Sequence, residues 1–582
     1  MLFASITRRC SVSLPEGVRR ADISLNSHHV TLAVDGRMGR LSVGDGELTA
    51  VEAAGAKEAG ASEFELVRAS VERATRTLRI SRLTCGGRPL YYTVTQEGQF
   101  FCSTHVSMLR RVGVPLTENA AALPEFLVYC FVTPPETLFK GISQVPYGQT
   151  LVVALRGDTV VVRLSGASFG IAQPPPLPDD GWDGPVSRTL MRTFELLSGS
   201  RDHVATLLSG GMDSSILTAL ASRVLGIRRT YSTSYPFEDP GQDVEEQYAL
   251  SAAAALGVNH SHHRPTVAEY LHGLLDAIAA AEEPLHGLQT VLLGCLFRRG
   301  LEPDRTLVVC GQGADGLMGL PLHEAVRRAR ENAGLLRYLS FPPIPSGIRL
   351  LAAASGRGHH LLSRVRDLRR YRVAISDTNS VIWDLQRYGS EDWVRAHFGV
   401  APGEIIANRL RALAGWAGRD LLDLISLLDL TGDIAAVQSL WSKIAESHGR
   451  TVVYPFTSPE LIEYLLGVPW SVKLSAPKAL AQGVARCLQI PDFIVSRPKS
   501  SFGVRASRWA NPGGPFEPLV PLVAPAVPES LIREVQSPRE DLARIYWNLL
   551  NYAIWRRLVV DGEPLDSLHA ELDSSSESLR PH

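Results

Sequence analysis

The residue types most suited to chemistry are concentrated in one short segment, which reads Leu208-Ser-Gly-Gly-Met-Asp-Ser-Ser215. Its adjacent glycines, Gly210 and Gly211, let backbone N–H groups approach an anion closely, and a helix N-terminus after them adds a favourable dipole. Hydroxyl donors for phosphate oxygens are also present: Ser209, Ser214 and Ser215. A turn that only caps a helix is the ordinary alternative, but such a turn does not require all of these residues together. The segment, from Leu208 onward, predicts a phosphate-binding loop.

Asp213 is the residue of this loop that opposes phosphate binding, because two anions repel. Its carboxylate makes sense if a Mg²⁺ ion lies between it and the phosphates, since Mg²⁺ is commonly held by one or two carboxylates together with substrate phosphates. Asp213 is therefore predicted to be a magnesium ligand.

The elements around the loop predict a parallel sheet. Buried-strand patterns occur at residues 203–208, 230–235, 259–263 and 305–310, and helical patterns at residues 214–223, 245–256 and 267–281. Strands that alternate with helices of this length are typical of a doubly wound α/β domain. Ligands of such domains bind at the carboxyl ends of the strands, where the loop lies.

The N-terminal part has a different pattern. From Ala21 to about Val162, short segments alternate between apolar and polar residues, which predicts a β-rich domain with helices at Glu63–Thr77 and Ala120–Phe131. A Pro-rich seam at Gly170–Gly184 marks the boundary. The chain is therefore predicted to have four parts: a first domain over 1–168, a linker over 169–185, the α/β domain with C-terminal helices over 186–565, and a disordered tail over 566–582.

Composition excludes several classes of protein. Lys plus Arg total 59 and Asp plus Glu total 60, so no net field favours nucleic acid or an anionic membrane. The 7 cysteines are scattered and include no Cys-x-x-Cys pair, which argues against disulfides or a zinc cage. The N-terminus does not read as a secretory signal, and no run of about eighteen apolar residues is present. We expect a soluble, cytoplasmic protein that binds neither nucleic acid nor membrane.

The segment Leu208–Ser215 is not a Walker A loop, because it lacks Gly-Lys-Ser/Thr. It resembles the pyrophosphate loop of the ATP pyrophosphatase superfamily, and the chain from about Ile80 to Ala510 resembles the asparagine synthetase-like branch. Gly311-Gln-Gly-Ala-Asp-Gly-Leu-Met-Gly319 is similar to the second glycine motif of that branch. The resemblance implies that ATP and Mg²⁺ are bound, with Asp315 as a second magnesium ligand. It also implies that Gly311 and Ser232, the latter on the second strand, join the loop in binding nucleotide.

Two further segments resemble parts of the same family. Ser496-Arg-Pro-Lys-Ser-Ser-Phe-Gly503 is similar to the segment of the catalytic lysine, which here is Lys499; an ordinary solvated lysine is the alternative. Glu282-Glu-Pro-Leu-His286 resembles a segment that lines the synthetase site, so Glu283 is a weaker catalytic candidate. Pro284 also explains this segment as a helix end.

Residues 80–155 resemble the glutaminase domain of the family, with matching stretches at Arg88–Tyr92, Glu136–Ile142 and Val145–Gly148. That domain uses an N-terminal cysteine as nucleophile. Position 2 is Leu here, and Cys10 is better explained as a structural thiol. We therefore predict a degenerate glutaminase-like sandwich that does not hydrolyse glutamine, followed by the α/β domain.

The resemblance implies an enzyme that adenylates a carboxylate, releases pyrophosphate and forms an amide. The β-lactam synthetases are similar enzymes that have a catalytic tyrosine at the position of Gln312. Because an amide side chain cannot act as a general base, their chemistry is not expected here. Loss of the glutaminase nucleophile most resembles lasso peptide cyclases, which would imply a precursor peptide substrate, a leader-binding protein and a protease as partners. The Arg-rich segment 327–372 would fit a peptide's carboxylates, or equally a solvated basic face. An amide synthetase for a small metabolite and a non-catalytic scaffold are the alternatives.

Overall fold

The computed structural model describes the whole chain except a set of short segments and one longer one. The excluded residues are 8–13, 16–17, 26–27, 36–38, 45–46, 54–64, 73, 83–84, 86, 167–175, 238–239, 332–380, 384, 417, 498–505 and 579–582. The first part of the linker, 169–175, and most of the Arg-rich segment therefore lie outside the described residues. No helix in the described parts is long and apolar enough to cross a membrane.

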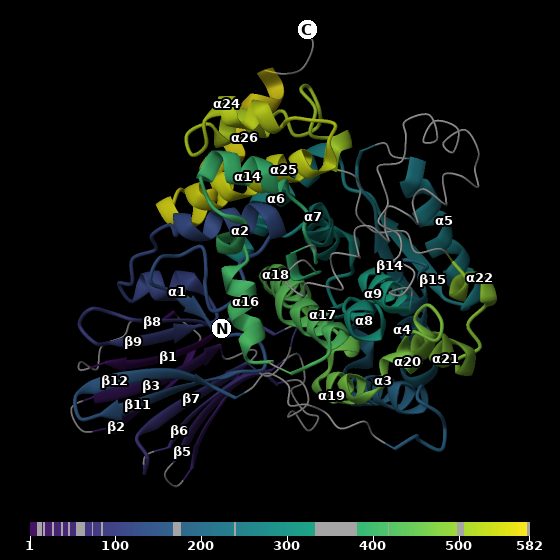
Figure 1. The fold of residues 1–582 in the computed structure, drawn as a ribbon, viewed down its shortest axis with the longest axis horizontal. Helices are drawn as coiled ribbons and strands as arrows, with labels where there is room; N and C mark the ends of the chain where they lie inside the picture. Colours follow the sequence, from purple (N-terminus) through teal and green to yellow (C-terminus); the bar gives the residue numbers. More distant parts are fainter. Residues whose placement is uncertain are drawn as a thin grey trace.

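The first domain is a sandwich of two antiparallel sheets (Figure 1), which confirms the predicted β-rich fold. One sheet has the order β10-β8-β9-β1-β3-β2 and the other β12-β11-β7-β6-β5-β4. Alternate residues such as Leu32, Ile80 and Leu151 are fully buried between the sheets. The strands are β1 Leu2–Thr7, β2 Val18–Leu25, β3 His28–Asp35, β4 Gly39–Gly44, β5 Glu47–Ala53, β6 Glu65–Glu72, β7 Thr77–Arg82, β8 Tyr91–Val94, β9 Phe100–Ser103, β10 Ser143–Gln144, β11 Thr150–Arg156 and β12 Thr159–Ser165.

The helix predicted at Glu63–Thr77 is wrong, because these residues include strand β6. Val67, Ala69 and Val71 are buried and alternate with more exposed residues, which is the period of a strand. Pairing with β5 on one side and β7 on the other fixes this register. The second predicted helix is confirmed, since Ala120–Ala122 form a 3₁₀ turn and α2 spans Leu123–Tyr129.

The second domain is built on a five-stranded parallel sheet with the order β15-β14-β13-β16-β17. The chain adds β14 and then β15 on one side of β13, and adds β16 and then β17 on the other side. The order therefore switches between β13 and β16, and the crevice at the carboxyl ends of these two strands is where such sheets bind ligands. The strands are β13 Val204–Leu207, β14 Arg229–Thr233, β15 Asn259–His263, β16 Leu307–Val309 and β17 Thr451–Val453.

Helices cover both faces of this sheet (Figure 1). They begin and end close to the predicted residues; the helix expected at 267–281, for example, is α6 Val267–Ala281. The main helices are α3 Gly184–Leu196, α4 Met212–Leu220, α5 Pro240–Ala255, α7 Leu288–Cys295, α8 Ala314–Met318, α9 Pro321–Glu331, α17 Leu421–Asp429, α18 Ala435–Ser447, α19 Pro459–Gly467, α20 Trp470–Lys473, α21 Ala479–Cys487 and α22 Asp492–Val495.

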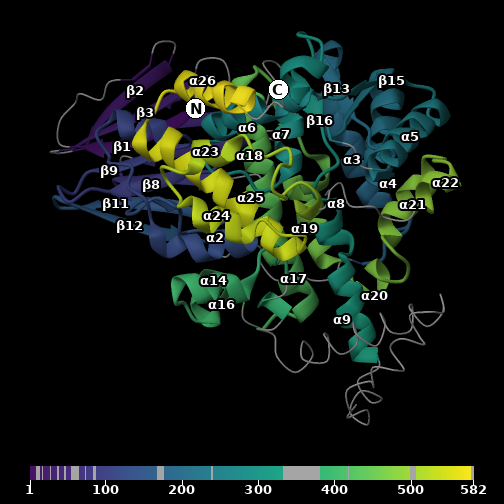
Figure 2. The ribbon, with the colours of Figure 1, turned by 90° about the horizontal axis from the view of Figure 1, so that it is seen from above.

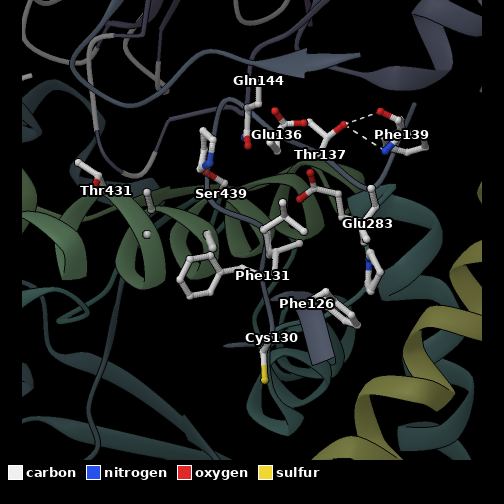
Figure 3. Close-up of a pocket in the computed structure, with 18 of the residues that line it drawn as sticks. Phe126, Cys130, Phe131, Glu136, Thr137, Phe139, Gln144, Glu283, Thr431 and Ser439 are labelled. Atoms are coloured by element: carbon white, nitrogen blue, oxygen red, sulfur yellow. Dashed lines mark hydrogen bonds between the residues drawn. The ribbon is translucent and has the colours of Figure 1, made fainter. Parts of the chain in front are cut away.

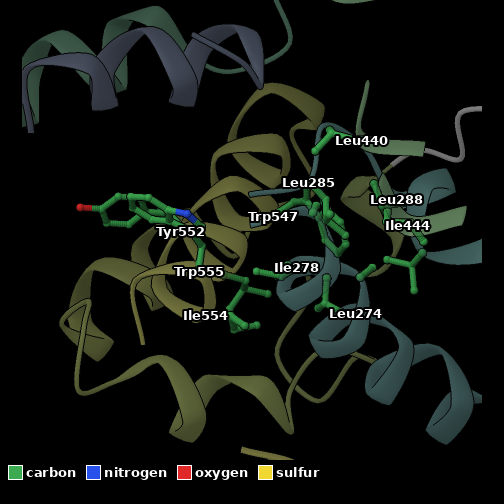
Figure 4. Close-up of a cluster of buried hydrophobic side chains, with 14 of the residues drawn as sticks. Leu274, Ile278, Leu285, Leu288, Leu440, Ile444, Trp547, Tyr552, Ile554 and Trp555 are labelled. Atoms are coloured by element: carbon green, nitrogen blue, oxygen red, sulfur yellow. The ribbon is translucent and has the colours of Figure 1, made fainter. Parts of the chain in front are cut away.

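The C-terminal helices lie over the junction of the two domains (Figures 1 and 2). They are α23 Leu519–Val523, α24 Glu529–Val535, α25 Glu540–Trp555 and α26 Leu565–Ser578. Figure 4 shows Trp547, Ile554 and Trp555 of α25 gathered with Leu274 and Ile278 of α6 in one apolar cluster. Buried Asn548 of α25 also donates to the Leu127 carbonyl of α2 at 2.9 Å. The first domain therefore shares a core with the second.

The tail predicted to be disordered over 566–582 is helical as far as Ser578. Leu568 and Leu572 of α26 are buried, and the helix packs on α6 and α23. Two leucines four residues apart supply an apolar face that the serine-rich and acidic composition of the tail concealed.

Candidate functional site

The predicted phosphate loop connects β13 to α4 with a backbone shape that requires glycine. Gly210 has a φ of +72°, and a Cβ atom there would lie 2.4 Å from the backbone carbonyl carbon of Tyr248 on α5. Gly211 follows as the N-cap of α4 and leaves the first N–H groups of the helix facing the loop. The loop can therefore surround an anion with N–H groups, as the sequence predicted.

The serines of the loop fix its conformation. The Ser214 hydroxyl donates to the Gly211 carbonyl at 3.0 Å and accepts from the Ser209 N–H at 3.2 Å. The Ser209 and Ser214 hydroxyls also lie 3.1 Å apart. Ser215 is completely buried beneath the loop, so it stands further from the surface than the other two serines.

The second glycine motif lies directly beside the first. Because β13 and β16 are neighbours, the residues that follow them meet at the same edge of the sheet. A Cβ atom on Gly311 would lie only 3.3 Å from the Ser214 backbone nitrogen, so the absence of a side chain lets the two loops touch. This contact brings Asp213, on the first turn of α4, close to Asp315 on α8.

Lys478 joins these two aspartates. Its Nζ atom lies 2.5 Å from Asp213 Oδ2 and 2.5 Å from Asp315 Oδ1. Burial alone would lower the pKa of Lys478, but the two carboxylates outweigh burial and hold the pKa above its ordinary value. The sequence analysis missed this lysine. The only signal was its place after Pro477, at the start of an amphipathic helix, and that signal carries no chemistry.

The residues present fit a Mg²⁺ ion. The Lys478 ammonium shows that a positive charge is stabilised against both carboxylates. Among the described residues, no group of three or more His, Cys, Asp or Glu side chains could hold a metal by itself. Two carboxylates with no further protein ligand are the usual donors for Mg²⁺ that is completed by waters and substrate phosphates.

Lys499 lies outside the described residues, but Arg497, two residues before it, contacts the phosphate loop. Arg497 donates to the Ser209 carbonyl at 3.1 Å and pairs with Glu245 at 2.5 Å. Its guanidinium also lies 3.9 Å from the centre of the Tyr248 ring. Arg497 therefore links the chain before Lys499 to the loop and to α5.

Ser232 lies on β14, the strand next to β13. Its hydroxyl is 2.7 Å from His260 Nε2 and 2.8 Å from His262 Nδ1, both on β15. Burial, followed by the neighbouring His262, lowers the pKa of His260 to about 4. Ser232 therefore connects two strands through neutral His260, in addition to its predicted contact with nucleotide.

The structure does not bring Glu283 into the cluster of Asp213, Asp315 and Lys478. Glu283 instead faces a cavity between the two domains (Figure 3), where it accepts a hydrogen bond from the Tyr91 hydroxyl of the first domain. Burial raises the pKa of Glu283. Other residues lining the cavity are Arg82, Phe131, Phe139, Thr431, Gly432 and Ser439.

Comparisons with known proteins agree with this geometry. Residues 187–533 match the family described as Asparagine synthase, which covers more than half of the chain and includes the loop, Asp315 and Lys478. Residues 49–162 match the family described as Glutamine amidotransferase domain. A search of curated proteins found no match.

Proposed function

Because this chain belongs to the asparagine synthase family, we propose that it activates a carboxylate with ATP as an acyl-adenylate and then joins the acyl group to an amine. ATP is cleaved to AMP and pyrophosphate, and the product is an amide. The observation that carries the proposal is the meeting of Asp213, Asp315 and Lys478 beside the phosphate loop, at the switch point of the parallel sheet.

The residues of the site act mainly on charge. A carboxylate that attacks the α-phosphorus of ATP meets the repulsion of the triphosphate. The loop N–H groups, the N-terminus of α4 and the Lys478 ammonium attract the phosphates and lower that repulsion. Mg²⁺, when bound by Asp213 and Asp315, would neutralise the phosphates and the pyrophosphate leaving group. Lys499 is proposed to help neutralise the phosphates and the pyrophosphate in the first step, and to stabilise the charge that develops on the acyl oxygen in the second step.

The proposed substrate is a precursor peptide, whose Asp or Glu side chain is joined to its own N-terminal amine as in lasso peptide cyclases. The amine must then come from the substrate and not from glutamine. In support, the first domain keeps its sandwich, but its strand β1 starts with Leu2, which is fully buried and pairs with Val34 of β3. Amide synthesis on a small metabolite is the second candidate. A leader-binding protein and a protease are the proposed partners for the peptide reaction.

ATP–pyrophosphate exchange tests the first half of the proposal. Purified protein with ATP and Mg²⁺ is screened against candidate precursor peptides and small carboxylates. We expect exchange that depends on one class of carboxylate and is abolished in Asp213→Asn. A protein that shows no exchange with any carboxylate, yet binds ATP, would instead be a nucleotide-binding scaffold.

Mass spectrometry tests the second half. A peptide that is cyclised loses the mass of one water. A small carboxylate that is converted to an amide gains the mass of the amine less one water. We also expect no glutamate from glutamine under any of these conditions. Formation of glutamate would contradict the reading of the first domain as a degenerate glutaminase.

A further inference from the structure

A histidine–aspartate pair beside the interdomain cavity has no role in the chemistry described so far. His286 follows Glu283 and Pro284, which line the cavity, and its Nε2 atom lies 2.7 Å from Asp433 Oδ1. His286 is only 5% exposed. The Phe131 ring, which also lines the cavity, stacks on the imidazole with ring centres 6.0 Å apart.

The contact with Asp433 determines where the proton of His286 lies. A carboxylate accepts a hydrogen bond, so Nε2 carries the hydrogen and Nδ1 keeps its lone pair in the neutral imidazole. Within the described part of the chain, this buried Nδ1 atom has no hydrogen-bond partner. A buried acceptor without a partner is costly, so a donor that reached Nδ1 would be bound favourably.

Two polar groups that line the cavity have side-chain partners. Glu283 accepts from the Tyr91 hydroxyl, and the Arg82 guanidinium donates to the Ser439 hydroxyl at 2.7 Å, although the Arg82 Nε atom has no partner among the described residues. His286 does not line the cavity itself, but it is adjacent to the lining residues Phe131 and Pro284, and its Nδ1 atom is an unpaired acceptor at that position.

The turn that carries Asp433 also contacts the second glycine motif. Asp433 belongs to a π-helical turn, Leu430–Ile434, and such turns are frequent at functional sites. The next residue, Ile434, packs on the second glycine motif, where a Cβ on Gly316 would lie 2.8 Å from its Cδ1 atom. One turn of helix thus contacts the motif of Asp315 and holds the carboxylate that orients His286.

We propose that His286, oriented by Asp433, is the base that accepts a proton from the attacking amine; this inference rests on the proposed function. The neutral primary amine donates its N–H to Nδ1. Its nitrogen forms a bond to the acyl carbon, the bond from that carbon to the AMP oxygen breaks, and AMP leaves with the electron pair. The N–H proton passes to Nδ1, and the Asp433 carboxylate stabilises the imidazolium.

The test compares two nucleophiles on the carboxylate that supports ATP–pyrophosphate exchange. Both nucleophiles lose an N–H proton as they are acylated, but methylamine is mostly protonated near neutral pH and therefore depends on a base. Hydroxylamine is weakly basic, stays unprotonated at that pH and is unusually nucleophilic, so it traps acyl-adenylates without help. In His286→Ala, we expect methylamide formation to fall by about 100-fold or more, the usual contribution of a general base. Exchange and hydroxamate formation should change by less than about threefold, and added imidazole should restore methylamide formation.

His272→Ala is the matched control. It removes a histidine of α6 whose Nε2 atom lies 2.8 Å from the Oδ1 atom of Asp573 on the C-terminal helix α26. All three activities should stay at wild-type levels.

Asp433→Asn provides a second variant that keeps an acceptor for Nε2–H but removes the charge. Tyr388 donates to Asp433 at 3.1 Å, and Tyr388 in turn interacts with three further titratable or charged groups: Cys130, Asp429 and Arg544. Without the carboxylate, the imidazolium that forms as the amine attacks loses its stabilising charge, so methylamide formation should fall while exchange and hydroxamate formation stay near wild-type levels. A purely structural role would lower all three.

Two results would overturn the assignment while leaving the proposed function intact: methylamide and hydroxamate formation that fall equally in His286→Ala, or a wild-type protein that forms hydroxamate but no methylamide. Absence of exchange in the wild-type protein would instead refute the proposed function, and the assignment with it.

Discussion

Lys478→Met isolates the electrostatics of the site, because it removes an ammonium that contacts both Asp213 and Asp315. The two carboxylate oxygens each lie 2.5 Å from Nζ, so they are at most about 5 Å apart and would then face each other directly. At an effective dielectric constant of about 20, two unit charges at that separation repel by about 3 kcal/mol. The three side chains are 18%, 21% and 29% exposed, so solvent screens the repulsion only in part.

Thermal unfolding measured in EDTA and in Mg²⁺, at matched ionic strength, detects this repulsion. In EDTA we expect Lys478→Met to be less stable than the wild type by a few kcal/mol. Mg²⁺ should remove most of the difference, because the ion replaces the missing positive charge. Mg²⁺ should stabilise the wild type less, since there the ion competes with Lys478 for the same carboxylates.

Lys473→Met is the control for this experiment. Lys473 is also buried and carries the same substitution, but it donates to the Leu465 carbonyl at 2.9 Å and has no contact with the two aspartates. Because its Asp213, Asp315 and Lys478 are unchanged, Mg²⁺ should stabilise this variant only as much as it stabilises the wild type. Equal stabilisation of wild type and Lys478→Met by Mg²⁺, or no loss of stability of Lys478→Met in EDTA, would refute the idea that Asp213 and Asp315 share one cation.

Three further predictions concern the phosphate loop, the proposed catalytic lysine Lys499 and a buried lysine. Asp213→Asn and Lys499→Ala should abolish release of pyrophosphate and leave the circular dichroism spectrum unchanged; near-normal turnover in either variant would show that its residue lacks the assigned role. Gly210→Ala should abolish ATP binding, because its Cβ would clash with Tyr248 at 2.4 Å, whereas Gly513→Ala, at a similar φ of +73° in open space, should bind ATP normally in the same calorimetric titration. Burial lowers the pKa of Lys473 to about 7, so the unfolded chain binds more protons than the folded chain from about pH 7 to pH 10. The free energy of unfolding of the wild type should therefore rise across that range by at most about 4 kcal/mol. The same free energy should depend less on pH in Lys473→Met. If the two proteins showed the same pH dependence, the Lys473 ammonium would be better solvated than its burial indicates.

The part of the site that follows from local pattern was predictable from sequence. The run of glycine, serine and aspartate after a buried strand predicted the loop Leu208–Ser215, and strand alternation placed its residues at the sheet edge. The proximity of Asp213 and Asp315 was implied by the family resemblance, and the neighbouring positions of β13 and β16 explain it.

The remaining parts depend on contacts between residues far apart in the chain. Lys478 pairs with Asp213 across 265 positions, and His286 meets Asp433 across 147. No spacing rule connects such residues, since only the packing of helices on the sheet brings them together. Strand β6 was mistaken for a helix because its glutamates, arginine and alanine are good helix formers, while pairing with β5 and β7 decides its conformation.

The core that the two domains share at α2 and α25 gives the first domain a structural role that needs no nucleophile. Tyr91 and Arg82 hold Glu283 and Ser439 of the other domain, and Phe131 covers His286. Removing the sandwich would open the cavity to water along one side and leave large aromatic surfaces bare. This wall depends on the fold of the first domain and not on a nucleophile, so it is needed whether or not glutamine is hydrolysed.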